Sequence, residues 1–372
     1  MKLVIDRNGL LKSLAHVQSV VERRNTIPIL SNILIDATGD AVTLTATDLE
    51  IAVLDSLDAQ VMTPGATTVP AHTLFDIVRK LPDGSEICLD TTEAEGRLTL
   101  SAGRSRFALS CLPRDDFPVM ADDSLPTSFE LAAKELARLV DKARFAISTE
   151  ETRYYLNGIY LHAADQDGDA MLRAVATDGH RLALVQMALP HGAEGMPDVI
   201  VPRKTVTEIR KLIDDVSGTV QIALSDTKIK FSVGSVTLTS KLIDGTFPDY
   251  NRVIPEGNDK ILKVDGASFA AAVDRVSTIS TEKSRAVKLA IGTDAVELSA
   301  NSPDAGSAVE EIAASYGAEP LEVGFNAKYL LDITTQIEGD EAEFVMADSG
   351  SPTIVRDGED DGALYVLMPM RV

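Results

Sequence analysis

The sequence predicts an α+β protein of three tandem domains, each with two helices packed on antiparallel sheets. The first observation is a repeat: Val69-Pro70-Ala71-His72 returns as Val201-Pro202-Arg203-Lys204 and, more faintly, as Phe325-Asn326-Ala327-Lys328. The offsets are 132 and 124 residues in a chain of 372. The second observation is that each third contains two helix-like segments and several alternating stretches. Such a fixed period is typical of a chain built from copies of one structural unit.

Other short motifs keep nearly the same period. Ala46-Thr47-Asp48 is followed 130 residues later by Ala176-Thr177-Asp178, and Ala300-Asn301-Ser302 is a weaker third copy. Asp116-Phe117-Pro118 likewise returns as Thr246-Phe247-Pro248. Proline cannot continue a β-ladder, so these motifs predict the end of a strand. Five features in one order indicate a repeat of about 120 residues.

The repeat predicts three domains, at residues 1–125, 127–253 and 254–372. Units of this length are large enough to bury a core of their own. The two junctions are short and contain proline, which favours close packing of the domains over flexible linkage.

Six helix-like segments are expected from apolar periodicity, and they are richer in basic residues than the rest of the chain. They hold 16 Lys or Arg against 8 Asp or Glu, whereas the whole chain has a net charge of −22. This segregation predicts a positive, helix-built surface on an acidic body, although solubility with a chance distribution is the alternative. The segments are residues 10–24, 72–81, 132–147, 203–213, 268–283 and 326–337.

The alternating stretches predict half-buried strands. Residues 41–45, 97–101 and 228–232 show this period of two. The stretch 103–109 is expected to place two arginines on one face and two apolar side chains on the other, namely Arg104 and Arg106 against Phe107 and Leu109.

Catalytic and metal chemistry has little support in the sequence. A hydrolase that uses Asp178 and His180 is an alternative function, but no nucleophile motif accompanies the pair, and a turn or binding surface is favoured. Residues 357–362 lack the ligand spacing of a calcium loop and predict an acidic hairpin tip. The lone cysteines Cys88 and Cys111 indicate a reduced, structural role. We expect no metal, cofactor, signal peptide or membrane span, and a cytoplasmic location.

Two segments have both an ordinary and a functional interpretation. Met368-Pro369-Met370 could simply end a core strand, yet methionine is also typical of surfaces that accept several partners. Arg153-Tyr154-Tyr155 could be core tyrosines or a stacking surface for nucleic acid.

Five motifs together resemble the bacterial sliding clamps, the beta subunits of replicative DNA polymerase III. The similarity covers the whole chain in order, and it is carried by residues 153–158, 176–182, 200–204, 247–250 and 368–371. It implies a non-catalytic processivity factor that closes as a head-to-tail homodimer into a ring around duplex DNA. Helices would line the hole and contact phosphates without sequence preference. A hydrophobic pocket would take short peptide motifs of the polymerase alpha subunit, the clamp-loader complex, other polymerases and repair proteins.

The resemblance also implies roles for individual residues. The DNA contacts would be Arg24, Tyr154, Tyr155, Arg203 and Lys204. The peptide pocket would comprise Leu156, Thr177, Gly179, His180, Arg181, Leu182, Pro248, Arg252, Val253, Val366, Met368, Pro369, Met370 and Arg371. The dimer interface would comprise Arg104, Arg106, Phe107, Leu109, Ile279, Glu310 and Glu311.

The chain departs from the family pattern at three places. His72 replaces a basic residue, and 149–150 (Thr-Glu) replaces a polar pair, which weakens the expectation of DNA contact there. Ser307 and Ala308 stand where acids are common at the dimer interface. We therefore expect a ring closed by fewer ion pairs.

Overall fold

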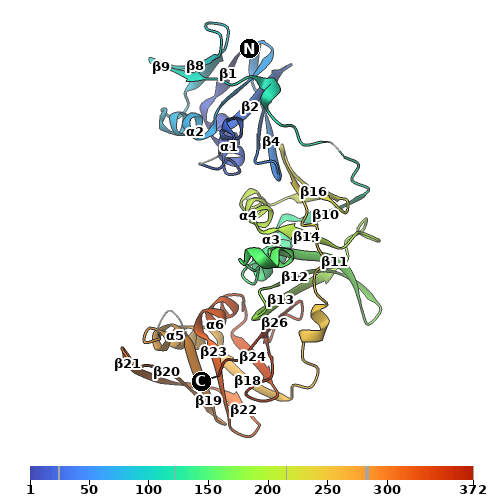
Figure 1. Ribbon diagram of the computed structural model, residues 1–372, viewed down its shortest axis with the longest axis vertical. Coiled ribbons are helices and arrows are strands. Elements are labelled where there is room, and N and C mark those ends of the chain that lie inside the picture. Colours follow the sequence, from blue (N-terminus) through green and yellow to red (C-terminus); the bar gives the residue numbers. More distant parts are fainter. Residues whose placement is uncertain (24–25, 122, 215, 281–284, 372) are drawn as a thin grey trace. The chain divides into compact units, whose positions relative to one another are not determined.

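The structure is a computed structural model that describes residues 1–23, 26–121, 123–214, 216–280 and 285–371 (Figure 1). Its internal contacts divide the chain into two compact units, each described here by itself. Unit 1 comprises Met1–Leu136, Pro190–Met196 and Thr207–Leu242. Unit 2 comprises Ala137–Leu189, Pro197–Val206 and Ile243–Val372.

Unit 1 contains two antiparallel sheets. The five-stranded sheet has the order β5-β1-β7-β8-β9, and the eight-stranded sheet has the order β10-β15-β16-β17-β4-β3-β2-β6. The first consists of β5 (Gln60–Thr63), β1 (Lys2–Asp6), β7 (Glu86–Asp90), β8 (Arg97–Ala102) and β9 (Ser105–Ser110). The second consists of β10 (Thr127–Ala132), β15 (Thr219–Leu224), β16 (Lys228–Val233), β17 (Val236–Lys241), β4 (Ile51–Asp58), β3 (Ala41–Thr47), β2 (Asn32–Thr38) and β6 (Gly65–Pro70).

Unit 2 also contains two antiparallel sheets. The nine-stranded sheet has the order β14-β11-β12-β13-β26-β25-β24-β18-β22, and the four-stranded sheet has the order β21-β20-β19-β23. The first consists of β14 (Val199–Pro202), β11 (Gly158–Gln166), β12 (Asp169–Thr177), β13 (Arg181–Ala188), β26 (Ala363–Leu367), β25 (Thr353–Asp357), β24 (Glu341–Met346), β18 (Lys260–Asp265) and β22 (Ser315–Tyr316). The second consists of β21 (Gly306–Ala313), β20 (Ala295–Ser302), β19 (Ala286–Ile291) and β23 (Leu321–Asn326).

One strand pair in each unit joins different thirds of the chain. In unit 1, β17 pairs with β4 and sets Thr239 opposite Ala52. In unit 2, β26 pairs with β13 and sets Val366 opposite Leu182. The two pairings occupy the same place in the repeat, because Ala52 and Leu182 each follow the shared Ala-Thr-Asp motif at the same distance. In each unit, therefore, one sheet contains strands from two successive repeats, which are joined by an equivalent pair of strands.

All six expected helices are present, with ends that differ from the prediction. The first begins at Arg7 because the side chain of Asp6 caps it by accepting a hydrogen bond from Gly9 N, and it ends at Gln18. Asp265 caps the fifth in the same way through Ser268 N. The helices are α1 (Arg7–Gln18), α2 (Ala71–Lys80), α3 (Ala133–Arg144), α4 (Arg203–Leu212), α5 (Gly266–Ser277) and α6 (Ala327–Thr334). Short 3₁₀ helices are η1 (Pro28–Ser31), η2 (Arg114–Asp116), η3 (Glu151–Leu156) and η4 (Tyr250–Val253).

The cores are built from one apolar stripe per helix. On α1, Leu10, Leu14 and Val17 are fully buried at helical spacing, and α1 contacts β3 and β4. Phe269 and Val273 begin the matching stripe on α5. Burying this stripe removes apolar surface from water and fixes each helix on its sheet.

One prediction about the end of a strand is wrong. Arg104 lies in the turn between β8 and β9, so it does not share a strand face with Arg106. The prediction of an acidic hairpin tip is confirmed, because residues 358–362 connect the antiparallel strands β25 and β26 and both Glu359 and Asp361 are exposed. Asp360, by contrast, is paired within the protein. The carboxylate of Asp360 accepts hydrogen bonds from Arg138 Nη2 at 2.6 Å and from Lys142 Nζ at 2.9 Å. These two cations hold the pKa of Asp360 down to about 2 against the opposing effect of burial.

Candidate functional site

The Thr-Asp motif before β13 forms a tight turn rather than a catalytic pair. Asp178 Oδ1 accepts hydrogen bonds from the backbone N–H groups of His180 at 2.9 Å and Arg181 at 3.1 Å. Asp178 Oδ2 accepts from Arg181 Nε at 3.2 Å. Both carboxylate oxygens are thus engaged without the His180 ring, which stacks instead near the ring of Tyr329. The hydrolase interpretation is wrong, since it needs Asp178 to orient His180.

The same turn recurs in unit 1, where no such histidine exists. Asp48 Oδ1 accepts from Glu50 N at 2.9 Å and from Ile51 N at 2.7 Å. Thr47 Oγ1 donates to Ile51 O at 2.8 Å, as Thr177 Oγ1 donates to Arg181 O at 2.7 Å. A hydrogen-bond pattern common to both repeats indicates a structural role for the Thr-Asp pair.

Arg181 is a buried structural cation. Its side chain is 6% exposed. Its guanidinium donates to Asp332 Oδ2 and to the carbonyl of Phe145, both at 2.6 Å. The guanidinium carbon lies 4.4 Å from the ring centroid of Tyr329 and 5.1 Å from that of Phe145. Because these contacts occupy most of the guanidinium N–H groups, Arg181 positions the turn and has few donors available for a ligand.

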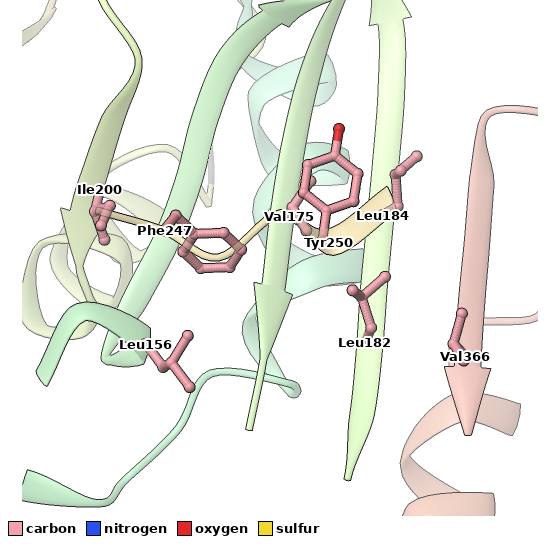
Figure 2. Close-up of a cluster of buried hydrophobic side chains, with 8 residues drawn as sticks. All are labelled: Leu156, Val175, Leu182, Leu184, Ile200, Phe247, Tyr250 and Val366. Carbon is pink, nitrogen blue, oxygen red and sulfur yellow. The ribbon is translucent and has the colours of Figure 1, made fainter. Parts of the chain in front are cut away.

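Next to this turn, side chains from several segments of unit 2 form one apolar cluster. In Figure 2, side chains from several strands, including Val366 on β26, lie around the segment that carries Phe247 and Tyr250. Its members are Leu156, Val175, Leu182, Leu184, Ile200, Phe247, Tyr250 and Val366. The pairing of β13 with β26 brings Leu182 opposite Val366. This apolar cluster would form the floor of the expected peptide pocket.

A stack of rings supports one side of this floor. The Tyr160 ring lies between those of His162 and Phe247, at centroid distances of 4.4 and 4.8 Å. The Tyr160 hydroxyl donates to Asp198 Oδ2 at 2.9 Å, and burial together with this carboxylate raises the Tyr160 pKa. His162 Nε2 lies 3.0 Å from the Tyr250 hydroxyl, and burial lowers the pKa of His162. The neutral imidazole can therefore share a hydrogen bond that fixes Tyr250.

The remaining expected pocket residues form its exposed border. Met368 is 40% exposed and Val253 is 48% exposed. The backbone N–H of Met368 donates to His180 O at 2.9 Å, and that of Met370 donates to Gly324 O at 2.8 Å. The terminal segment is thereby attached to the turn. Pro248, Gly179, Arg252 and Arg371 are exposed, while Thr177, Pro369 and Met370 are half-buried.

The expected DNA contacts come from η3 and from the start of α4, where Arg203 N donates to Asn157 O at 2.9 Å, and Arg24 is outside the described residues. Tyr154 is 54% exposed on η3, and its ring meets that of Tyr155 edge-on at a centroid distance of 5.7 Å. Arg203 and Lys204 begin α4. An exposed ring beside a helix that begins with two cations can contact phosphates and base or sugar edges.

The departures at positions 72 and 150 have structural explanations. His72 Nε2 lies 2.9 Å from the carbonyl of Val21 and so donates to it, which uses the ring within the protein. Glu150 forms a two-point ion pair with Arg153, at 2.6 and 2.8 Å, that lowers the pKa of Glu150. The His72 ring is therefore engaged within the protein, and the Glu150 carboxylate would repel a phosphate.

The expected dimer residues lie on two sheet edges. Arg106, Phe107 and Leu109 belong to β9, and Glu310 and Glu311 belong to β21; each strand is the last of its sheet. Arg106 Nη2 donates to Glu93 Oε2 at 2.5 Å. Glu310 accepts from Arg275 at 2.5 and 3.0 Å, and this pair lowers the Glu310 pKa. Ile279 is half-buried, after the end of α5.

Several residues of the floor were missed by sequence reasoning. Val175 and Leu184 looked like ordinary strand residues, and nothing local distinguishes the face of a strand that binds a partner. Ile200, Phe247 and Tyr250 lay in motifs that carried the resemblance but received no role. Among the described residues, no group of three or more His, Cys, Asp or Glu side chains could share a metal ion, and no helix is long and apolar enough to cross a bilayer.

The domains of the DNA polymerase III beta subunit match this chain: N-terminal over residues 1–121, central over 130–249 and C-terminal over 251–371. The chain is 57% identical over 372 residues to the beta sliding clamp of Caulobacter vibrioides and 37% identical over 376 to that of Escherichia coli K12, covering all of each pair of chains. A crystal structure of the Caulobacter crescentus clamp, with polyethylene glycol bound to its putative beta-motif tethering region, has a TM-score of 0.98 at 57% identity, covering 100% of this chain and 99% of that one. A Bartonella birtlesii clamp bound to griselimycin has a TM-score of 0.97 at 53% identity, with full coverage of both. These matches confirm the prediction of three tandem clamp domains. The chain therefore belongs to the family of DNA polymerase III beta subunits, the beta sliding clamps.

Proposed function

We propose that this non-catalytic clamp closes as a homodimeric ring around duplex DNA and tethers partners through the pocket on the apolar cluster of unit 2. The partners would be the polymerase alpha subunit, the clamp-loader complex, and other polymerases and repair proteins that carry short peptide motifs. We place it in the cytoplasm, where a replication clamp meets chromosomal DNA. We set the domain limits at residues 1–125, 127–253 and 254–372.

One observation carries the pocket assignment. The turn is common to both repeats, but the apolar floor beside it differs: Leu182 and Val366 stand opposite each other in unit 2 where Ala52 and Thr239 stand in unit 1. The larger apolar pair sits beside the exposed Met368, and methionine adapts to differently shaped ligands. Buried apolar floors with few polar groups at the border are typical of small ligand sites.

For DNA, we assign contacts to Arg203, Lys204, Tyr154 and Tyr155, with Arg24 carried over from the family resemblance. Two cations at the start of α4 would attract phosphates through a salt-dependent, sequence-independent interaction. Weak contacts suffice because a closed ring holds duplex DNA by topology.

The repeat also suggests how two copies would join. The pairs β17–β4 and β26–β13 connect successive domains, and β9 and β21 are the strands left at the equivalent positions. If β9 paired antiparallel with β21 of a second copy, in the register that β17 has with β4 and β26 with β13, Phe107 would stand opposite Ala308 and Ala108 opposite Ser307. Exposed strand edges readily pair in this way.

Charge would contribute little to this interface. Arg106 and Glu310 are already paired within their own chain, with Glu93 and Arg275, so an intermolecular pair must replace an existing one. Exposed ion pairs contribute only about 0–1 kcal/mol. The charge reversal Arg106→Glu combined with Arg104→Glu should accelerate dimer dissociation less than tenfold, as measured by subunit exchange. A much larger effect would contradict closure by few ion pairs.

Disulfide trapping tests the register. In a background without Cys88 and Cys111, the pair Ala108→Cys and Ser307→Cys should form an intermolecular disulfide, because directly opposed residues lie about 4.5–5.5 Å apart. Ala108→Cys with Glu311→Cys is the control and should not cross-link. The reverse result would overturn the register.

Retention on DNA tests the clamp function. Protein loaded by its clamp loader should stay on nicked circular DNA and slide off after linearisation. Retention on linear DNA with free ends would count against a topological mechanism. His180→Ala should weaken the binding of a partner peptide while an already loaded ring stays on circular DNA, so the pocket and the ring are tested separately.

A further inference from the structure

A second groove lies in unit 1, at the place in the repeat that the peptide pocket occupies in unit 2. It has a volume of about 320 Å³ and lies between the β4–β17 strands and residues 117–121, 123 and 125. We call it the linker groove and define it by the side chains that line it: Leu34, Thr45, Ala52, Leu54, Thr237, Thr239, Lys228, Lys230, Phe117, Pro118, Val119, Met120, Ala121, Asp123 and Leu125.

The groove occupies the sheet face that points away from the domain core. Ala52 and Leu54 line it, whereas Val53 between them is fully buried on the opposite face. On β17, Thr237 and Thr239 line it, and Leu238 between them is fully buried. This alternation gives the groove a floor of four side chains from two paired strands.

Strand registers relate these side chains to those of the peptide pocket. Leu54 stands opposite Thr237 in unit 1, and Leu184 stands opposite Leu364 in unit 2. Leu54 is 37% exposed, however, while Leu184 is only 7% exposed. In unit 2 the ring of Tyr250, three residues after Phe247, packs into the cluster. At the equivalent distance after Phe117 stands Met120, which lines the groove without closing it.

Two lysines and one carboxylate, that of Asp123, border the groove. Lys228 and Lys230 on β16 line it, although the chain as a whole has a net charge of −22. Lys228 pairs with Asp123 and also donates to the carbonyl of Ala121 at 3.0 Å. Lys230 is half-buried, its backbone belongs to the strand ladders with Ala223 and Thr239, and its ammonium group has no hydrogen-bond or ion-pair partner within the described residues. A cation beside an apolar floor favours a ligand that carries both an apolar side chain and a carboxylate.

We propose that the linker groove is a second docking site, which takes an extended segment of a partner protein with an aliphatic or aromatic side chain next to an acidic residue. The apolar side chain occupies the floor around Leu54, and the carboxylate pairs with Lys230. The proposal rests on the peptide-binding role of the pocket in unit 2, because the two sites are related by the repeat. A ring dimer would thus carry two kinds of docking site, one selective for acidic segments.

Methyl NMR of the intact protein tests both sites in one sample. The probe is the acetylated, amidated peptide Asp-Asp-Leu-Phe-Asp, and the reporters are the methyl groups of Leu54 for the groove and Leu182 for the pocket. We expect saturable shifts at Leu54 below about 1 mM peptide, a range typical of small interfaces. Absence of any shift at Leu54 at 2 mM would overturn the proposal.

Variants and a reversed-charge peptide complete the test. Lys230→Glu should weaken binding at Leu54 at least tenfold and leave Leu182 unaffected; Lys241→Glu, on a lysine that pairs with Glu50 outside the groove, should change neither. Ala52→Trp should fill the groove and also abolish the Leu54 response. Equal binding of Lys-Lys-Leu-Phe-Lys, or survival of binding in Lys230→Glu, would refute the acidic selectivity. If the peptide shifted the methyl signals of Leu54 but not those of Leu182, this result would instead count against the proposed pocket of unit 2.

Discussion

Replacement of Arg181 separates residues that contact a partner from residues that hold the pocket in shape. Its side chain is 6% exposed and hydrogen-bonds to Asp178, Asp332 and the carbonyl of Phe145. Arg181→Ala would leave two partly buried carboxylates without their cation and a carbonyl without its donor. Breaking a buried ion pair on one side costs about 3–5 kcal/mol. Because Asp332 is 31% exposed, we expect about 3 kcal/mol of lost stability in unit 2.

Urea unfolding measured by circular dichroism gives the required comparison, since the chain has no tryptophan. His180→Ala is the matched control, because His180 is exposed in the same turn and its loss should change the free energy of unfolding by less than about 0.5 kcal/mol. Arg181→Lys should be intermediate, since lysine cannot reproduce the planar, multiple contacts of the guanidinium. Peptide titrations should then show weaker binding in both variants. In His180→Ala the loss of binding should occur without a loss of stability, whereas in Arg181→Ala it should accompany the destabilised turn. If Arg181→Ala were as stable as His180→Ala yet failed to bind peptide, Arg181 would contact the peptide and this reasoning would be wrong.

Three further outcomes are expected. The pKa of Asp360 is about 2 in the folded protein against 3.8 ordinarily, so its ion pairs contribute about 2 kcal/mol of stability above pH 4, and this contribution is lost as the pH falls towards 2. In urea unfolding, the difference in free energy of unfolding between wild type and Asp360→Asn should therefore become smaller over that pH range. The control variant Asp361→Asn should not differ from wild type. Leu49 has a φ of +80°, so Leu49→Gly should stabilise unit 1 by about 1 kcal/mol in urea unfolding, and a loss of stability would contradict strain there. Arg203→Ala and Lys204→Ala should each reduce the slope of log affinity against log salt by about 1 in DNA titrations, and an unchanged slope would remove that residue from the DNA surface.

Regular elements were predictable where a single period dominated the sequence. The apolar stripe of α1 identified a helix, but its extent was set by capping. Asp6 caps the helix so that it begins at Arg7, three residues before Leu10, the first apolar residue used to find it. The Thr-Asp turns were found as a repeat, and a turn was the favoured interpretation because no nucleophile accompanied His180. The turn between β8 and β9 was misplaced because Arg104 fits an alternating pattern as well as Arg106 does.

The candidate site was less predictable because its parts meet only through the fold. Arg181 and Asp332 are separated by 151 residues, and an arginine in a short polar motif normally suggests exposure. The burial of Asp360 against Arg138 and Lys142 was missed for the same reason: an acidic run indicates solvent unless its distant cations are known. The resemblance supplied the border of the proposed pocket, while Ile200 was placed in the apolar cluster by the pairing of β14 with β11 and Tyr250 by the packing of η4.

The position after the Thr-Asp pair shows how the repeat separates scaffold from function. Leu49 and Gly179 both adopt positive φ, at +80° and +87°, so the turn itself tolerates a side chain at some cost. At Gly179, a Cβ would lie 2.6 Å from Arg153 Nη1, whereas Leu49 is 41% exposed. A side chain at position 179 would therefore displace the guanidinium of Arg153, which is the end of a flexible side chain ion-paired with Glu150. The turn is common to both repeats, and the glycine occurs in the one beside the proposed peptide pocket.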